Sequence, residues 1–165
     1  MNGPKFRPYR SEDKDRCIEI FMSNTPRYFG VEEMDEFRQF LENLPCAYFV
    51  ATQNDEIVAC GGHGYHGTKQ AIVLCWGMVP AEFHKQRLGE FMLIERLRHI
   101  YKDFGPTIVQ IDTSQHSQGF FERYGFQVKE VTDNYFAAGL HRVAMELQLN
   151  GEHHRILISK VEIHQ

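Results

Sequence analysis

A stretch of fifteen residues in the middle of the chain, VPAEFHKQRLGEFML, gathers groups that can bind an anion. It places His84, Lys85, Arg87 and Gly89 between a strand-like run and a helix-like run. The first amides of a helix have no intrahelical acceptor, and the aligned peptide dipoles add partial positive charge there. A glycine lets the backbone approach a phosphate closely, and the two cations can add charge-assisted hydrogen bonds. The junction could therefore hold a phosphate-sized anion, with an ordinary loop of solvated cations as the alternative.

Two other positions carry groups that could accept a proton. Asp112 shares one face of the strand-like run TIVQIDT with Gln110, where a central strand should be apolar. His63 follows the run IVACGG, and an imidazole can accept a proton near neutral pH. Either residue is a candidate general base. The alternatives are a strand-end hydrogen bond for Asp112 and a satisfied hairpin histidine for His63.

Composition excludes several classes of function. The 165 residues suit one domain that can bury a core without disulfides. A net charge of −4 and a pI near 6.1 argue against nucleic acid and anionic membranes as partners. The apolar runs are shorter than the ~20 residues that a bilayer span needs, and the first residues lack the apolar core of a signal peptide. We therefore expect a soluble cytoplasmic protein.

Neither the cysteines nor the remaining histidines suggest a metal. No C-x-x-C pair occurs, which argues against a zinc site and a redox motif and favours buried free thiols. The C-terminal histidines have no convincing ligand spacing, and we expect no bound metal. The residues concerned are Cys17, Cys46, Cys60, Cys75, His153, His154 and His164.

Strand-like and helix-like runs alternate without repeats or linkers, which predicts one α/β unit. The long helical crossover between the runs 71–79 and 107–113 favours a parallel pairing of these two strands. The expected elements are a strand at 5–9, a helix from an N-cap at Ser11 to about Ser23, a helix at 32–44, a hairpin at 47–67, a strand at 71–79, a helix at 87–102, a strand at 107–113, a helix that stops at Gly125, and an antiparallel pair at 127–132 and 141–149 around a loop at 133–140.

Two blocks of the sequence resemble the GNAT superfamily of N-acetyltransferases. His84 to Gly89 fall on the six places of the superfamily's motif A, R/Q-x-x-G-x-G/A, after a strand that ends in Val. The block IDTSQHSQGFFERYGF, residues 111–126, is similar to motif B with its aromatic ending. Because the elements between the motifs also come in the family's order, the resemblance covers residues 5–149.

The resemblance implies a fold and a reaction. The fold is an α/β, acyl-CoA N-acyltransferase fold: a mixed, mostly antiparallel sheet with a splayed parallel strand pair, flanked by helices. It would occupy residues 1–149 as one domain, with 150–165 as an extra strand or a tail that could pair across a homodimer. The reaction is transfer of an acetyl group from acetyl-CoA to the primary amine of a small molecule or peptide, in a ternary complex without a covalent intermediate.

The resemblance also assigns residues to the coenzyme. The pantetheine arm would lie between the strands 72–79 and 107–113, and a strand-end amide near Met78 or Val79 would polarise the thioester carbonyl. Ser114 and Ser117 would hydrogen-bond the pantetheine amides, with helix capping as the alternative. The expected coenzyme-binding residues are Met78, Val79, His84, Lys85, Gln86, Arg87, Leu88, Gly89, Glu90, Ser114, Ser117, Phe120 and Phe121.

Several positions depart from the family's pattern. His84 stands where Arg or Gln is usual, and Arg87 replaces the first glycine of motif A, which we expect to be tolerated only at right-handed helical angles. Ser114 takes the place of a frequent Asn. Phe121 takes the place of the tyrosine that many members use to protonate the departing thiolate, so this role does not carry over. Tyr124, one turn later, is the candidate acid, with solvent as the alternative.

The acceptor amine should contact residues between the motifs. The candidates are aromatic or imidazole side chains, each with core packing as the alternative: Tyr28, Phe29, Trp76, Tyr135 and His141. Glu32, Glu33 and Asp35 could attract a cationic amine, although acids in a first helical turn need no such role. Other hypotheses are a catalytically silent acyl-CoA-binding module and a structural domain without a cofactor.

Overall fold

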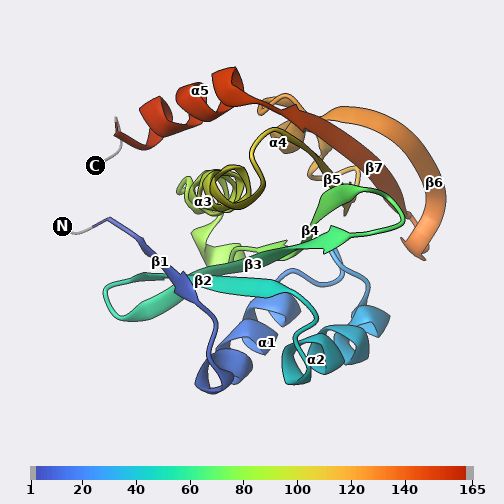
Figure 1. The fold of residues 1–165 in the computed structure, drawn as a ribbon. Coiled ribbons are helices and arrows are strands. Elements are labelled where there is room, and N and C mark those ends of the chain that lie inside the picture. The colour runs from blue at the N-terminus through green and yellow to red at the C-terminus, as the bar shows by residue number, and fades with distance from the viewer. Residues whose placement is uncertain (1–2, 163–165) are drawn as a thin grey trace.

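A seven-stranded mixed sheet, in the order β1-β2-β3-β4-β5-β7-β6, separates two layers of helices (Figure 1). The structure, a computed structural model, describes residues 3–162. Its strands are β1 (Lys5–Pro8), β2 (Ala47–Gln53), β3 (Glu56–His66), β4 (Ala71–Met78), β5 (Thr107–Thr113), β6 (Gln127–Ala137) and β7 (Leu140–Leu149). Its helices are α1 (Lys14–Ser23), α2 (Met34–Glu42), α3 (Leu88–Phe104), α4 (Gln118–Glu122) and α5 (Gly151–Glu162), with short 3₁₀ turns at Ser11–Asp13, Val31–Glu33 and Ala81–Phe83.

The sheet confirms the expected fold class. β4 and β5 form a parallel pair, and every other neighbouring pair of strands is antiparallel. The hairpin of β2 and β3 turns at Asn54 and Asp55, both of which adopt positive φ. Helices α1 and α2 cover one face of the sheet, and α3, α4 and α5 lie over the other (Figure 1).

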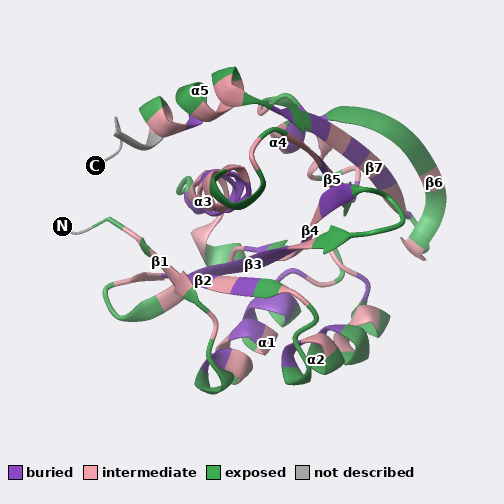
Figure 2. Cartoon of the chain, viewed as in Figure 1, coloured by how far each residue is buried: buried purple, intermediate pink, exposed green. Residues whose placement is uncertain are grey.

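Two apolar layers hold the helices on the sheet, and the burial follows the two faces (Figure 2). On one face Phe21 and Phe37, both fully buried, pack against Val50 of β2. On the other face Leu93 and Leu97 of α3 join a cluster with the inner residues of β4, β5 and β7. The strand β4 is apolar on both faces because it lies between these two layers.

The start of the first helix differs from the prediction. Ser11 does not cap it, because residues 11–13 form a 3₁₀ turn and α1 begins at Lys14. The carboxylate of Asp13 makes the local contacts instead: it accepts a hydrogen bond from the amide of Arg10 (2.8 Å) and pairs with Arg7 (2.8 Å). The carboxylate of Asp13 thus satisfies the backbone amide of Arg10, three residues before it, as the acidic residue of a capping box does.

The predicted loop at 133–140 is wrong. β6 continues to Ala137, and only residues 138 and 139 separate it from β7. The register between these strands shifts between Thr132 and Ala137, so residues 133–136 form a bulge that interrupts the ladder. The polar run of residues 133–135 marked this bulge and not a loop.

The segment 150–165 is neither an extra strand nor a tail over its described part, because residues 151–162 form α5. Leu157 is 4% exposed and packs in the cluster under α3, and the ring of His154 stacks on Tyr101 at 4.2 Å. These contacts explain the helix: a short amphipathic segment gains stability from packing that its weak pattern did not reveal. Residues 163–165 lie outside the described part.

No described helix is long and apolar enough to span a membrane.

Candidate active site

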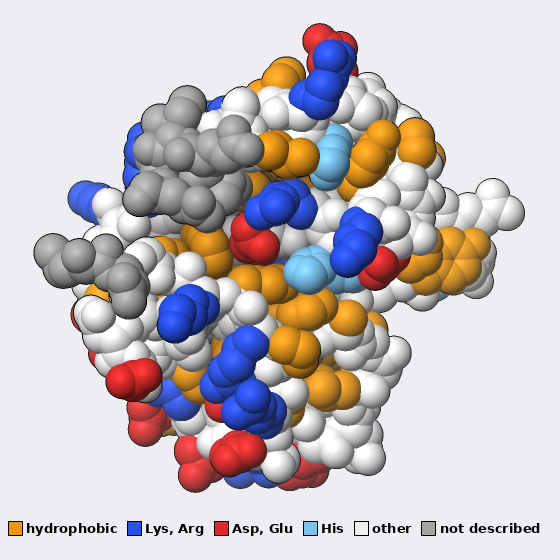
Figure 3. All heavy atoms as spheres, turned by 60° about the vertical axis from the view of Figure 1, so that its left-hand side comes forward, with side chains coloured by type: hydrophobic (Ala, Val, Ile, Leu, Met, Phe, Trp, Pro, Cys, Tyr) orange, Lys and Arg blue, Asp and Glu red, His pale blue; other side chains and the backbone are white. Residues whose placement is uncertain are grey.

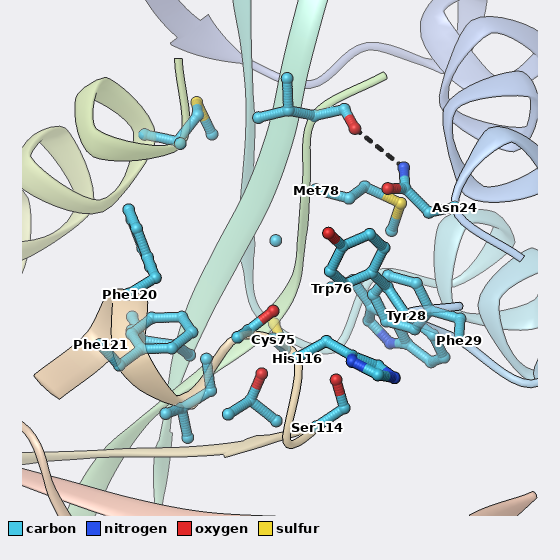
Figure 4. A pocket seen from close by; sticks show the side chains of 18 of the residues that line it. Asn24, Tyr28, Phe29, Cys75, Trp76, Met78, Ser114, His116, Phe120 and Phe121 are labelled. Atoms are coloured by element: carbon cyan, nitrogen blue, oxygen red, sulfur yellow. Dashed lines mark hydrogen bonds between the residues drawn. The ribbon is translucent and has the colours of Figure 1, made fainter. Parts of the chain in front are cut away.

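A cleft opens where the parallel strands β4 and β5 separate. Their pairing covers only residues 72–74 of β4 and 109–111 of β5, and both strands continue beyond it. The resulting cavity has a volume of about 1310 Å³. Phe120 and Phe121 of the α4 region lie on one side of it, and Tyr28, Phe29 and Trp76 lie on the other (Figure 4).

A bulge in β4 shapes the middle of the cleft. Cys60 of β3 pairs with Met78, whereas Gly62 pairs with Cys75, so β4 has one residue more than β3 in this stretch. Trp76, in the bulge, adopts a φ of 45°, which is uncommon for a bulky side chain. The bulge interrupts the β3–β4 ladder at residues 76 and 77, beside the expected thioester carbonyl site at Met78 and Val79.

The end of β4 is fixed by two side chains. The carbonyl of Val79 accepts hydrogen bonds from Asn24 Nδ2 (2.8 Å) and His84 Nε2 (3.0 Å). His84 Nε2 also lies 3.1 Å from Asn24 Oδ1, and because both neighbours are acceptors this nitrogen carries the hydrogen. The imidazole of His84 therefore anchors the strand end in addition to lining the cleft. Asn24, 4% exposed, was not identified from the sequence.

The start of α3 lies at one end of the cleft. Arg87 adopts left-handed angles (φ 63°, ψ 15°), so the prediction that it must be right-handed is wrong. The position keeps the conformation that a glycine would adopt, at a cost of roughly 1–2 kcal/mol for a side chain. No side chain caps α3, and its first intrahelical bond runs from the Phe91 amide to the Arg87 carbonyl (3.0 Å). The three preceding amides, at residues 88–90, have no intrahelical acceptor.

Aromatic side chains of α4 form the wall next to this helix start. A Cβ on Gly89 would lie 3.7 Å from the ring of Phe120, an ordinary contact distance. Phe120 packs on Tyr124 (5.2 Å), whose hydroxyl is hydrogen-bonded to Glu90. Four cationic side chains line this end of the cleft: Lys85, Arg87, Arg123 and Lys160.

The candidate acid lies at this wall. Burial, followed by the hydrogen bond to Glu90, raises the pKa of Tyr124 to about 12. A phenol with this pKa is a weaker acid near neutral pH than an ordinary tyrosine. Phe121, 7% exposed, lines the cleft at the position where the family resemblance would place a tyrosine, and it has no proton to donate.

Ser114 is the clearest sign of a polar ligand. It is 3% exposed, it lines the cleft, and its Oγ has no hydrogen-bond partner among the described residues. A buried hydroxyl without a partner is unfavourable unless a ligand or water satisfies it. Ser117 also lines the cleft and stands at the N-cap of α4, but its side chain makes no capping hydrogen bond.

The two candidate bases lie in different places. Asp112 lines the cleft, and its carboxylate is paired with Arg142 Nε at 3.0 Å. His63 does not line the cleft: it is 5% exposed on β3, with its ring stacked on Phe49 at 5.5 Å. Burial, and then the charge of Arg96, lower the pKa of His63 to about 4. The interior thus holds His63 neutral.

Acidic and aromatic side chains line the other end of the cleft. Two glutamates from the 3₁₀ turn before α2 and one from the first turn of α2 line it, together with aromatic residues from the α1–α2 segment, β4 and the β6 bulge: Glu32, Glu33, Glu36, Tyr28, Phe29, Trp76, Tyr135 and Phe136. Burial raises the pKa of Glu33, although the amide of Gly30, which donates to Glu33 Oε2 (2.7 Å), acts in the opposite direction. A Cβ on Gly30 would lie 2.8 Å from the carbonyl oxygen of Phe136, so the two segments nearly touch.

The structure brings most of the expected residues together but not all of them. Gln86 and His141 do not line the cleft. His141 instead accepts a hydrogen bond from the amide of Asn134 (2.9 Å) and so supports the β6 bulge. Phe136, His116 and Glu36 line the cleft and were not predicted. The bulge that turns Phe136 inwards has no periodic signal in the sequence.

Comparison with known proteins identifies the family. A model of the acetyltransferase (GNAT) domain matches residues 21–149. The chain belongs to the GNAT acetyltransferase family. No curated protein is detectably similar in sequence.

Solved structures of this family share the fold. The ribosomal-protein-S18-alanine N-acetyltransferase of Escherichia coli has a TM-score of 0.74 at 14% identity, over 90% of this chain and 95% of that one. An aminoglycoside 6'-N-acetyltransferase in complex with coenzyme A has a TM-score of 0.70 at 13% identity, over 87% and 96%. The yncA protein of Salmonella typhimurium, solved with its cofactor acetyl-CoA, has a TM-score of 0.71 at 14% identity, over 90% and 95%.

The left-handed conformation at Arg87 predicts an order of stability between two variants. Arg87→Gly should be more stable than Arg87→Ala by about 1 kcal/mol, because both lose the same side-chain contacts and only glycine adopts these angles without strain. Urea denaturation of the two variants measures the difference. Equal stabilities would show that residue 87 is not left-handed in solution.

The low pKa of His63 predicts a loss of stability in acid. The unfolded chain binds a proton at the ordinary pKa of 6.5, whereas the folded chain binds it only near 4. Protonation of His63 in the unfolded chain therefore lowers the free energy of unfolding by up to about 3 kcal/mol as the pH falls from 6.5 towards 4. Above pH 6.5 this loss is absent. His63→Phe, which keeps a ring beside Phe49, should show a flatter unfolding free energy between pH 7 and 4. A variant with the full acid loss of the wild type would contradict this.

Proposed function

We propose that this protein transfers an acetyl group from acetyl-CoA to the primary amine of a small cationic molecule. One observation carries the proposal: a single cleft at the β4–β5 splay joins the uncapped start of α3 to an end lined by glutamates and aromatic rings. The first is a site for the phosphates of the coenzyme, and the second is a site for a cationic, partly apolar acceptor.

The residues at the α3 end fit the coenzyme. The amides of residues 88–90 and the cations Lys85 and Arg87 would hold the pyrophosphate. The buried hydroxyl of Ser114 would hydrogen-bond the pantetheine arm, which satisfies its unpaired Oγ. When bound, acetyl-CoA supplies a thioester whose carbonyl carbon the amine attacks and whose thiolate leaves.

The middle of the cleft supports the chemical step. A main-chain N–H directly after the β4 bulge, at Met78 or Val79, would donate to the thioester oxygen as negative charge develops there. Neither Phe121 nor Tyr124 is a good proton donor near neutral pH. We infer that water protonates the leaving thiolate, which is feasible because a thiol has an ordinary pKa near 8.5 and the thiolate is a stable product.

Glu33 is the residue that we propose as the proton acceptor. It lines the acceptor end, and burial raises the pKa of its carboxyl, which makes it a stronger base than an ordinary glutamate. The amide of Gly30 holds one carboxylate oxygen at 2.7 Å and so orients the group. Asp112 is less suited because its carboxylate is engaged in an ion pair with Arg142 at 3.0 Å.

The charge at the acceptor end selects the class of amine. Glu32, Glu33 and Glu36 attract a cation and repel a carboxylate, while the rings of Trp76 and Tyr28 can pack on an apolar body or a cation. An amine without a carboxylate, such as phenethylamine, suits this end better than the matching amino acid. The short Gly30–Phe136 approach narrows this end and favours a small acceptor over a bulky one.

Binding of the coenzyme should be visible as thermal stabilisation. Acetyl-CoA at about 100 times its Kd should stabilise the wild type by roughly 2.7 kcal/mol. Gly89→Leu should fold but bind at least tenfold more weakly, since its side chain enters the space beside Phe120. Gly119→Leu, at an open position outside the cleft, is the matched control. Equal binding by both variants would refute the coenzyme site.

Turnover should follow the charge of the acceptor. We expect kcat/KM for phenethylamine to exceed that for phenylalanine at least tenfold, measured by release of CoA. The double change Glu32→Gln and Glu36→Gln should lower this ratio about three- to tenfold, as expected for two partly screened charges. Asp35→Asn, an exposed acid outside the cleft, should leave the ratio unchanged.

An outcome with tight acetyl-CoA binding and no turnover on any amine would favour the second candidate, a catalytically silent acyl-CoA-binding module. The phenylalanine at position 121 and the arginine at position 87 are the observations that support this candidate.

A further inference from the structure

Helix α5 lies beyond residues 21–149, the part that matches the family, yet it is packed firmly beside the cleft. Leu157 is 4% exposed in the same cluster as Leu97 and Ile100 of α3. At the start of the helix the ring of His154 stacks on Tyr101 at 4.2 Å. These contacts along α3 determine which face of α5 points inwards.

Lys160 lies on that inner face. It follows Leu157 by three residues, a spacing that places both side chains on one side of a helix. Its Nζ lies 4.9 Å from the ring centroid of Tyr124, and the residue lines the cleft. No carboxylate among the described residues pairs with Lys160. The structure thus directs a positive charge into the coenzyme end of the cleft, where it forms no ion pair with a described side chain, although Glu90, hydrogen-bonded to Tyr124, lines the same cleft.

A short chain of contacts relates Lys160 to the start of α3. Tyr124, under the ammonium group, packs on Phe120 at 5.2 Å, and Phe120 lies next to the Gly89 position. Two ring contacts therefore connect Lys160 to the proposed pyrophosphate site. In Figure 3, Lys and Arg side chains lie beside histidine side chains and hydrophobic surface on the face that comes forward.

We propose that Lys160 binds the 3'-phosphate on the ribose of coenzyme A, so that α5 is part of the coenzyme site. This rests on the proposed function. A phosphate monoester carries close to two negative charges at pH 7, and an ammonium group that forms no ion pair with a described side chain is a suitable partner. Arg123, directly after α4, is a second cation that lines the cleft, with its guanidinium 5.7 Å from the centroid of the Phe120 ring. The 3'-phosphate is on the ribose next to the pyrophosphate, and Lys160 lies at the aromatic wall next to the start of α3.

The test compares two coenzymes that differ only in this phosphate. Affinities for acetyl-CoA and for 3'-dephospho-acetyl-CoA are measured by titration calorimetry on the full chain. The wild type should prefer acetyl-CoA at least fivefold. Lys160→Met, which keeps the apolar contact with Tyr124, should lose this preference while its affinity for the dephospho analogue is unchanged. Lys160→Arg, which keeps the positive charge, should retain most of the preference for acetyl-CoA. Arg155→Ala, on the exposed face of α5, should bind both coenzymes as the wild type does.

Two results would overturn the proposal. One is an unchanged preference for acetyl-CoA in Lys160→Met. The other is an equal loss of affinity for both coenzymes, which would place Lys160 at the pyrophosphate instead. A wild type that binds neither coenzyme would instead refute the proposed function, so the two failures are distinguishable.

Discussion

The buried guanidinium of Arg96 connects helix α3 to the bulged strand that opens the cleft. It is 3% exposed, its Nε donates to the carbonyl of Met92 on its own helix (3.1 Å), and its Nη1 donates to that of Gly62 on β3 (3.3 Å). A Cβ on Gly77, in the β4 bulge, would lie 2.8 Å from Nη2, so only glycine leaves room for this approach. No described carboxylate pairs with Arg96, and burial lowers its pKa.

A buried charge with few partners is costly to rearrange, because moving the helix would separate the guanidinium from the carbonyl of Gly62 on β3 and leave both without that hydrogen bond. The position of α3 relative to the bulge is therefore tightly restrained. This restraint matters for the proposed function, in which the helix start would hold the phosphates of the ligand and the backbone beside the bulge would bind its thioester. The Asn24–His84–Val79 contacts restrain the loop between them in the same way.

The structure of the cleft also explains how residues that differ from the family's motifs are tolerated. Arg87 occupies a left-handed position where the family has glycine, so the loop geometry survives the substitution and its strain is borne locally. Phe121 removes a proton donor from the cleft wall, and the chemistry tolerates this if the thiolate is a stable leaving group. The opposite charges of the two ends, with cations near α3 and α4 and glutamates near α2, match a polyanionic donor and a cationic acceptor.

The sequence by itself determined the strand–helix order, the parallel crossover and the junction at residues 84–89, because periodicity and the motif residues are local signals. It also pointed to Tyr28, Phe29 and Trp76, which the fold does bring to the cleft. Only the tertiary structure decided that His63 is enclosed and neutral, that the β6 bulge turns Phe136 inwards, and that Lys160 reaches the cleft from α5. These outcomes depend on packing between elements distant in the chain, which local pattern does not encode.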